Sequence, residues 1–334
     1  MAHSRRLIAM LALLAMLFIT AGCGLETEDS GSTDEGGGFQ PEDTPEFMVH
    51  TGPGGGSDIF VRDLIELMRS EGIIDENWPV RNEDAGEGAG AMNHLMTNDG
   101  ATDIISAMTT TWITTPLTIE GATVTVEDLT PIAGLIIEPE VMAVASDAPY
   151  DSLTDFIEAA KEQPGALVQT GGSTTEVGAL NGETIQAATD TEWKFLSFEE
   201  VGQRVTALLN GDAHMMFGSA QDFASQIDAG KLKVVATISP DPSPLYPDAP
   251  TVEDEGIDAE LVAQVRGVMG PPNLPDDALE YFEGLFDETL QTQAWEEYAE
   301  KNGLVTQFLA GEEWSSYLED QVTKVEEALE NADL

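Results

Sequence analysis

The residues best suited to ligand chemistry lie in a glycine-rich turn at 51–58, Thr-Gly-Pro-Gly-Gly-Gly-Ser-Asp. The turn follows an apolar strand candidate at 47–49 and leads into a segment whose apolar residues recur at helical spacing. Glycines let backbone N–H groups approach a guest closely, and the first turn of a helix adds unpaired N–H groups with partial positive charge. The turn therefore favours an anion such as a carboxylate or phosphate, although a tight connection without a ligand has the same signature.

Two more glycine-rich turns repeat this design, at 84–90 and 170–174. Each follows a short strand candidate and leads towards a helix, and ligands of α/β folds bind beyond the carboxyl ends of strands. Three hydroxyl residues at 109–111 follow another strand candidate. They either add donors to the same site or simply begin a helix.

Short apolar strands alternate with amphipathic helices along most of the chain. Strands are predicted at 103–108, 141–145 and 232–238, and a helix at 153–162 ends at Pro164-Gly165. This alternation predicts an α/β fold with mainly parallel sheets and flanking helices. Apolar stripes near the C-terminus, including Trp314, Leu318 and Val325, are interpreted as core.

The composition is strongly acidic, with 62 Asp and Glu against 13 Lys and Arg and a formal net charge of −49. Such a surface repels phosphate backbones, so nucleic acid is excluded as a partner. The acids are spread along the whole chain, which favours a halophilic protein, because concentrated salt screens repulsion between surface charges. An acidic patch that binds cations is the alternative.

The N-terminus predicts export. Arg5 and Arg6 precede an apolar run at 7–19, which is too short to span a membrane, so residues 1–22 are interpreted as a signal peptide. The two arginines fit a twin-arginine signal or an ordinary charged leader. Cys23, the only cysteine, follows a sequence that resembles a lipobox, which predicts lipid attachment. Residues 23–46 would then be a disordered acidic linker that holds the protein on the outer face of the cytoplasmic membrane.

Several segments together resemble the substrate-binding receptors of tripartite tricarboxylate transporters, the Bug-type receptors. The turn at 51–58 is similar to their Pro-Gly-Gly-x-x-Asp loop, and 107–116, 170–173 and 229–236 are similar to later motifs. The best match is 246–257, Tyr-Pro-Asp-Ala-Pro-Thr-Val-Glu-Asp-Glu-Gly-Ile. The segment 197–202 and His214 depart from the family pattern. Both lie in the second domain, so the departures concern the contacts to the far end of the ligand and not the carboxylate site in the first domain.

The resemblance implies a two-domain periplasmic-binding fold of type II, with one domain from 47–137 and 242–334 and the other from 138–241. The domains would close over a small carboxylate about crossings near Glu138-Pro139 and Ser239-Pro240. In this family the acid is held largely by backbone amides and water rather than by arginine. The expected ligand-binding residues are Pro53, Gly54, Gly55, Gly56, Ser57, Asp58, Gly88, Gly90, Thr109, Thr110, Thr170, Gly171, Gly172, Ser173, Phe198 and Ser219.

The expected function is a monomeric, extracytoplasmic receptor that delivers a mono-, di- or tricarboxylate to membrane permease subunits. A sensor of the same fold that signals to a membrane partner remains an alternative, and a hydrolytic enzyme is a weaker one. The chain lacks a nucleophile elbow and a P-loop lysine, and its histidines show no metal-ligand spacing. No enzymatic activity, cofactor or metal is therefore expected.

Overall fold

The computed structural model describes residues 39–198, 200–332 and 334. The expected signal peptide and the lipid attachment at Cys23 lie outside these residues. The described end of the expected linker is packed, because the ring of Phe39 contacts that of Tyr281 edge-on with 5.8 Å between ring centres. No helix in the described residues is both long and apolar enough to cross a membrane.

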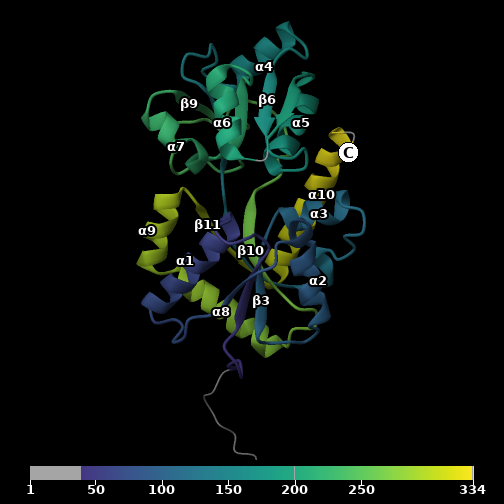
Figure 1. Ribbon diagram of the computed structural model, residues 1–334, viewed down its shortest axis with the longest axis vertical. Coiled ribbons are helices and arrows are strands. Elements are labelled where there is room, and N and C mark those ends of the chain that lie inside the picture. The colour runs from purple at the N-terminus through teal and green to yellow at the C-terminus, as the bar shows by residue number, and fades with distance from the viewer. Residues whose placement is uncertain (1–38, 199, 333) are drawn as a thin grey trace, which may run out of the picture. The chain divides into compact units, whose positions relative to one another are not determined.

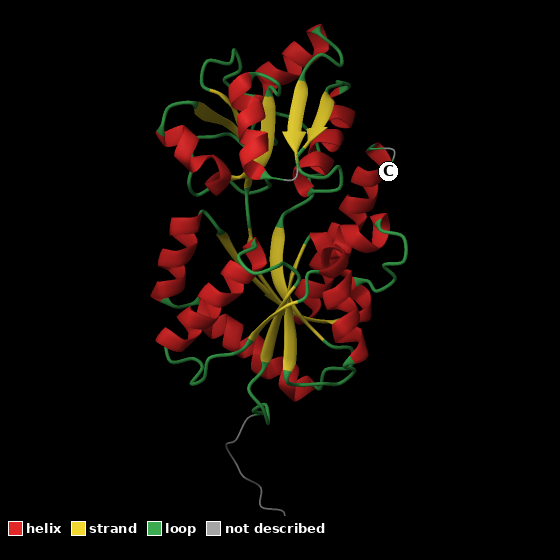
Figure 2. Cartoon of the chain, viewed as in Figure 1, coloured by secondary structure: helices red, strands yellow, loops and turns green. Residues whose placement is uncertain are grey.

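Two sheets organise residues 39–334 (Figures 1 and 2). The first sheet has the strand order β11-β4-β10-β3-β1-β2 and the second has the order β7-β6-β8-β5-β9. The strands of the first sheet are β1 (Glu46–Val49), β2 (Val80–Asn82), β3 (Ile104–Thr109), β4 (Thr130–Ile137), β10 (Val265–Gly270) and β11 (Val305–Ala310). Those of the second are β5 (Glu140–Ala145), β6 (Val168–Gly171), β7 (Lys194–Ser197), β8 (Met215–Ser219) and β9 (Leu232–Ile238).

Both sheets are mixed, which corrects the expectation of mainly parallel sheets. In the first sheet β1 pairs in parallel with β2 and β3, whereas β10 is antiparallel to β3 and β4. In the second sheet β6 is parallel to β7 and β8, whereas β5 is antiparallel to β8 and β9. Three strands are reversed, because the edge strand β11 is also antiparallel to β4. Of these, β5 and β10 begin where the chain passes between the sheets, so their direction follows from long-range topology that local periodicity does not encode.

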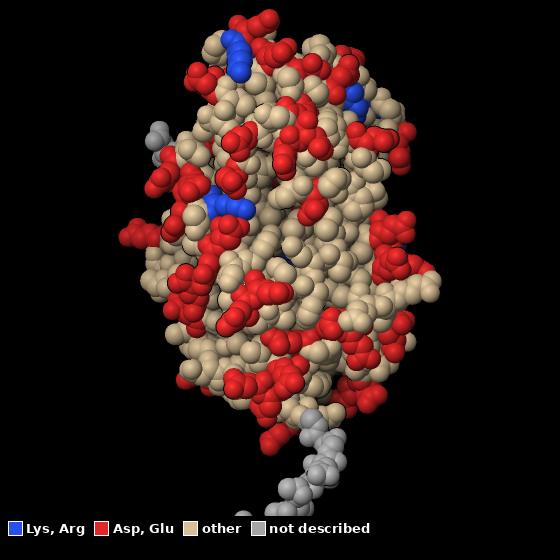
Figure 3. All heavy atoms as spheres, turned by 180° about the vertical axis from the view of Figure 1, so that it is seen from behind, with Lys and Arg blue, Asp and Glu red and all other residues tan. Residues whose placement is uncertain are grey.

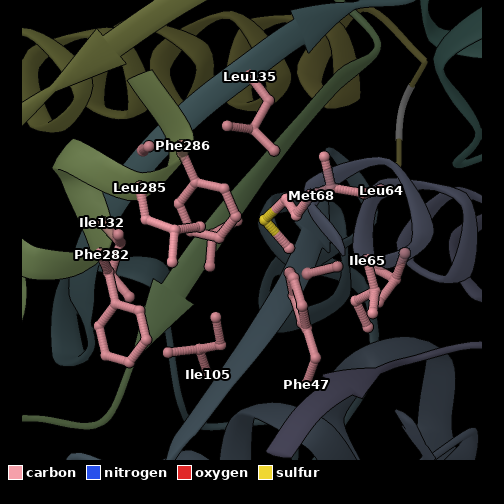
Figure 4. Close-up of a cluster of buried hydrophobic side chains, with 14 of the residues drawn as sticks. Phe47, Leu64, Ile65, Met68, Ile105, Ile132, Leu135, Phe282, Leu285 and Phe286 are labelled. Carbon is pink, nitrogen blue, oxygen red and sulfur yellow. The ribbon is translucent and has the colours of Figure 1, made fainter. Parts of the chain in front are cut away.

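Helices cover both faces of the first sheet (Figure 1). The helices α1 (Gly56–Ser70), α8 (Asp276–Leu290) and α9 (Gln293–Asn302) pack on one face. The other face carries α2 (Ala89–Thr97), α3 (Thr111–Thr118) and α10 (Gly311–Asn331). Short 3₁₀ turns, η1 (Ala85–Gly88) and η2 (Val126–Asp128), complete this part. Figure 4 shows the core between this sheet and α1, α8 and α9, where Phe47 of β1, Met68 of α1 and Phe286 of α8 lie close together.

The second sheet also lies between helices. One face packs against α4 (Leu153–Glu162) and α5 (Val177–Thr189), and the other against α6 (Val201–Asn210) and α7 (Ala220–Asp228). Val252 and Leu261 join the core under α4 although the chain has by then left strand β9. Residues 252–261 therefore pack with the second sheet.

The indole of Trp314 sets the local packing of β4 and β10. Trp314 is 1% exposed, and Cβ atoms added to Gly134 and Gly267 would lie only 2.6 and 2.5 Å from its ring. Both glycines are therefore needed for close approach of the strands to the indole. The added Gly267 Cβ would also lie 2.7 Å from the carbonyl oxygen of Ala133, a backbone atom that has little room to move.

Gly267→Ala is expected to destabilise the protein by about 1–3 kcal/mol, because the extra methyl overpacks the core. Chemical denaturation in concentrated salt measures this free energy of unfolding. Gly284→Ala is the matched control, because Gly284 lies inside α8 with nothing within 4 Å of an added Cβ. It should be neutral or stabilising by up to about 1 kcal/mol through helix propensity. Equal effects of the two substitutions would contradict the packing argument.

Candidate functional site

A cleft of about 630 Å³ lies between the two sheets. Its floor is formed where the chain passes between them, at Glu138, Gln264 and Arg266. The Glu138 N–H donates to the Gln264 carbonyl at 2.8 Å, so the two crossing segments are hydrogen-bonded to each other. The first turns of α1 and α3 line one side, with Gly56, Phe60, Thr111 and Thr114 among the lining residues, and α5, α6, α7 and the end of β8 line the other.

Arg266 is the main positive group on the first-sheet side. Its Nε and Nη2 donate to the same oxygen of Glu138, at 3.1 and 2.7 Å, and its Nη1 lies 3.4 Å from the Ser57 hydroxyl. The guanidinium also lies 5.7 Å from the ring centre of Phe60, a cation–π contact. Burial opposes ionisation of Glu138, but the adjacent guanidinium outweighs it and lowers the pKa of that carboxyl. Arg266 is thereby fixed at the start of α1.

The first turn of α1 supplies free donors beside Arg266. Gly55 is the N-cap residue and has no capping side chain. No hydrogen-bond partner for the N–H groups of Gly56 or Ser57 is found among the described residues, whereas the Asp58 N–H donates to the Thr51 hydroxyl at 3.2 Å. Unpaired N–H groups at a helix start and an adjacent guanidinium together favour an oxyanion.

The remaining donors of the first glycine turn are used inside the protein. The Gly54 N–H donates to Asp58 at 2.9 Å, and the same carboxylate accepts from Arg62 and from Asn82. These bonds, led by that from Arg62, hold the pKa of Asp58 well below its usual range. Asp58 is 4% exposed, so the turn is built around an internal carboxylate.

Asp58→Ala is expected to destabilise the protein by about 1–3 kcal/mol, because it removes charged hydrogen bonds and leaves buried donors unpaired. Because the pKa of Asp58 is lower in the folded than in the unfolded protein, ionised Asp58 stabilises the fold. This stabilisation is fully present above the unfolded-state pKa and is lost as the pH falls below that pKa. Asp58→Asn should retain part of the stability. Thermal unfolding from pH 7 to pH 3 measures the difference, which should shrink towards the acid end. A difference that is constant with pH would show that the charge of Asp58 is unimportant.

The third glycine turn also donates to a carboxylate of the protein itself. The Gly172 N–H donates to a carboxylate oxygen of Glu176, whose other oxygen lies 3.5 Å from Nη1 of Arg204. The Nε of Arg204 donates to the Phe198 carbonyl at 2.9 Å. Glu176, four residues after Gly172, thus occupies the position expected for the ligand at this turn, as Asp58 does four residues after Gly54.

The expected threonine donors at the strand ends also have partners within the fold. The Thr110 hydroxyl donates to the Ala263 carbonyl and accepts from the Val265 N–H, at 2.7 and 3.0 Å. The Thr170 hydroxyl donates to the Leu196 carbonyl at 2.9 Å. Thr109 lies 3.3 Å from Nε2 of His50, a buried imidazole whose pKa is lowered to about 4, mainly by burial.

Of the sixteen expected ligand-binding residues, Gly56 and Ser219 line the cleft. Ser219 ends β8 and is the N-cap residue of α7. Gly88 has a different role, because its φ of 100° and the 2.9 Å between an added Cβ and Trp112 require glycine for packing. The others form neighbouring turns or strand ends without lining it: Pro53, Gly54, Gly55, Ser57, Asp58, Gly90, Thr109, Thr110, Thr170, Gly171, Gly172, Ser173 and Phe198.

The glycine-turn motifs give no indication of the charged residues of the cleft. Four carboxyls and two guanidiniums line it, namely Glu138, Glu140, Glu176, Asp222, Arg204 and Arg266. A signal was present for Arg266, one of only 13 basic residues, because it interrupts the apolar segment 261–270. The resemblance implies an acid held largely by backbone amides and water rather than by arginine, whereas this cleft has an arginine on each side.

A family model, the tripartite tricarboxylate transporter family receptor, matches residues 80–334. The chain belongs to this family. Members of the tripartite tricarboxylate transporter receptor family are solute-binding proteins that act outside the cytoplasm, not enzymes. Protein BugT of Bordetella pertussis is 22% identical over 288 residues, which are 84% of this chain and 86% of BugT.

Solved structures of receptors share the two-sheet fold. A TctC solute-binding protein from Polaromonas, solved without ligand, matches with a TM-score of 0.76 and 20% identity over 87% of this chain and 99% of its own. An R. palustris protein solved with adipate matches with a TM-score of 0.71 and 17% identity over 88% of this chain and 98% of its own. The chain is therefore a solute-binding receptor with a periplasmic-binding fold.

Proposed function

We propose that this receptor captures a small organic acid in the cleft between the sheets and delivers it to permease subunits in the membrane. The observation that carries the proposal is the start of α1, where Arg266 lies 3.4 Å from the Ser57 hydroxyl and the N–H group of the cleft-lining Gly56 has no partner among the described residues. A carboxylate there would accept charge-assisted hydrogen bonds from the guanidinium and from the helix start. The adipate in a structural neighbour supports the same ligand class.

The two sheets would act as two domains that close over the acid. We place the first crossing at Glu138-Pro139 and the second at 262–264, because residues 252–261 pack with the second sheet. Closure also involves α5, whose Asn181 exchanges two hydrogen bonds with Val262, at 3.0 and 2.8 Å. Hinges of this kind absorb backbone rotation at a few residues between rigid parts.

We further propose a monomeric receptor that is tethered to the membrane by lipid on Cys23. A sensor that binds the same acid and signals to a membrane partner would have the same cleft. Co-purification with the two membrane subunits of a permease supports transport, whereas capture of a signalling protein in their place supports the sensor.

A thermal-shift screen of mono-, di- and tricarboxylates in concentrated salt tests the proposed ligand class. A bound acid at about 100 times its dissociation constant should stabilise the protein by about 2.7 kcal/mol. Sugars and inorganic cations are the negative controls. Stabilisation by a sugar with no response to any acid would overturn the assignment.

The strongly acidic surface is expected to make folding depend on salt. Acidic side chains cover much of the surface, as Figure 3 shows for the face seen from behind, and the net charge is −49. Their mutual repulsion is screened over about 3 Å in 1 M salt but over about 30 Å in 0.01 M salt. We therefore expect the melting temperature to fall steeply, with loss of structure, when KCl is removed.

Circular dichroism during dialysis from molar KCl into dilute buffer measures this loss. Sucrose is the control, because it is excluded from protein surfaces without screening charge. Sucrose should not replace KCl. A protein that is equally stable in dilute buffer would not be halophilic.

A further inference from the structure

The second-sheet side of the cleft carries two acidic groups that form no ion pair with the residues that the structure describes. Glu138 is paired with Arg266, and Glu176 with Arg204. Glu140 and Asp222 line the same cleft and form no ion pair within the described part of the chain. Their positions are well defined, since Glu140 begins β5 and lies against Gly178 of α5, whereas Asp222 lies in the first turn of α7 against Gly218.

One of these carboxyls is incompletely satisfied. The Oε2 atom of Glu140 is buried and has no hydrogen-bond partner among the described residues. An unpaired buried oxygen costs free energy unless a ligand, water or proton satisfies it. Glu140 lines the cleft, so a ligand bound in the cleft can contact its side chain.

The acidic groups reinforce one another. Burial raises the pKa of Glu140 well above its usual value, and the nearby Glu176, Glu138 and Asp222 add to the shift while Arg204 opposes it. Burial and Glu138 raise the pKa of Asp222 to about 6, with Arg204 opposing and Glu176 adding. The second-sheet side thus resists additional negative charge. A positive group there would relieve the repulsion and release any bound proton.

We propose that the ligand is a zwitterion whose carboxylate binds at α1 and Arg266 and whose ammonium group binds between Glu140 and Asp222. This inference rests on the proposed function and narrows its ligand class. A second carboxylate at the far end would meet two unpaired acids, whereas an ammonium group supplies donors to the unsatisfied Glu140 oxygen. Selectivity comes as much from repulsion of the wrong ligand as from attraction of the right one.

Titration calorimetry in concentrated KCl tests this with three series of three to six carbons: ω-amino acids, α,ω-diacids and simple monocarboxylates. We expect the best ω-amino acid to bind at least about tenfold more tightly than the diacid and the monocarboxylate of the same length. At pH 6, measurements in two buffers of different ionisation enthalpy should show proton release with the amino acid. A diacid should cause proton uptake.

The double variant Glu140→Gln/Asp222→Asn should lose this preference, so that amino acid and diacid of one length bind within a few-fold of each other. Glu326→Gln/Glu330→Gln, on exposed positions of α10, removes the same charge and should keep the preference. Tighter binding of diacids than of amino acids by the wild type would overturn the zwitterion proposal and leave the carboxylate function intact. Binding of diamines or divalent cations alone, or of no carboxylate at all, would overturn both.

Discussion

Arg266→Gln is expected to weaken binding of every carboxylate by about 10- to 100-fold, because a hydrogen bond to a charged partner contributes about 1.5–3 kcal/mol. The side chain is 15% exposed and is held by Glu138 and Ser57 next to the open donors of α1. Glutamine keeps some of the packing but removes the positive charge. Calorimetric titration in molar KCl with the best acid from the screen gives the affinity ratio.

The single variant has a second effect that must be separated from the first. Glu138 would be left without its partner, and breaking a buried ion pair on one side costs about 3–5 kcal/mol. Arg266→Gln/Glu138→Gln removes both charges and should recover much of this stability without recovering affinity. Arg69→Gln, on the exposed end of α1, is the matched control for loss of one positive charge. Full affinity in the double variant would exclude Arg266 from carboxylate binding.

Trp314→Ala is expected to lower the free energy of unfolding by about 3–5 kcal/mol, because removal of a buried aromatic ring leaves a cavity. The indole is 1% exposed, lies against two glycines of β4 and β10, and stacks on Tyr317 with 5.7 Å between ring centres. Glycines at these positions leave no side chain to fill the space. Denaturant unfolding in molar KCl measures the loss.

Trp314→Phe provides the graded comparison and should lose less, because it keeps an aromatic ring in the same site. Leu209→Ala, at a position 38% exposed, is the control for shortening an apolar side chain and should change stability little. If Trp314→Ala costs less than about 1 kcal/mol, the core of this face does not depend on the indole.

Local patterns predicted many elements of the fold. The strand at 232–238 and the helix at 153–162 agree with β9 and α4 in their bounds, because an apolar run and an apolar stripe each end at clear breakers. The direction of β5 and β10 could not be predicted in this way. It depends on where the chain crosses between the sheets.

The candidate site was predicted less completely. The glycine turns do present N–H groups, but the groups that accept from Gly54 and Gly172 are the chain's own Asp58 and Glu176. The spacing of four residues in both turns was a usable signal. Arg266 could not be connected with the first turn from sequence, because 209 positions separate it from Ser57 and only the pairing of β10 with β3 brings them together.

A crystal structure of the receptor, grown in concentrated salt with the acid that stabilises it best, would show directly where the carboxylate binds. We predict a carboxylate within hydrogen-bond distance of the Gly56 N–H group and of the Arg266 guanidinium, both of which line the cleft. An acid bound elsewhere on the protein, or one held in the cleft without contact to α1 or Arg266, would contradict this prediction.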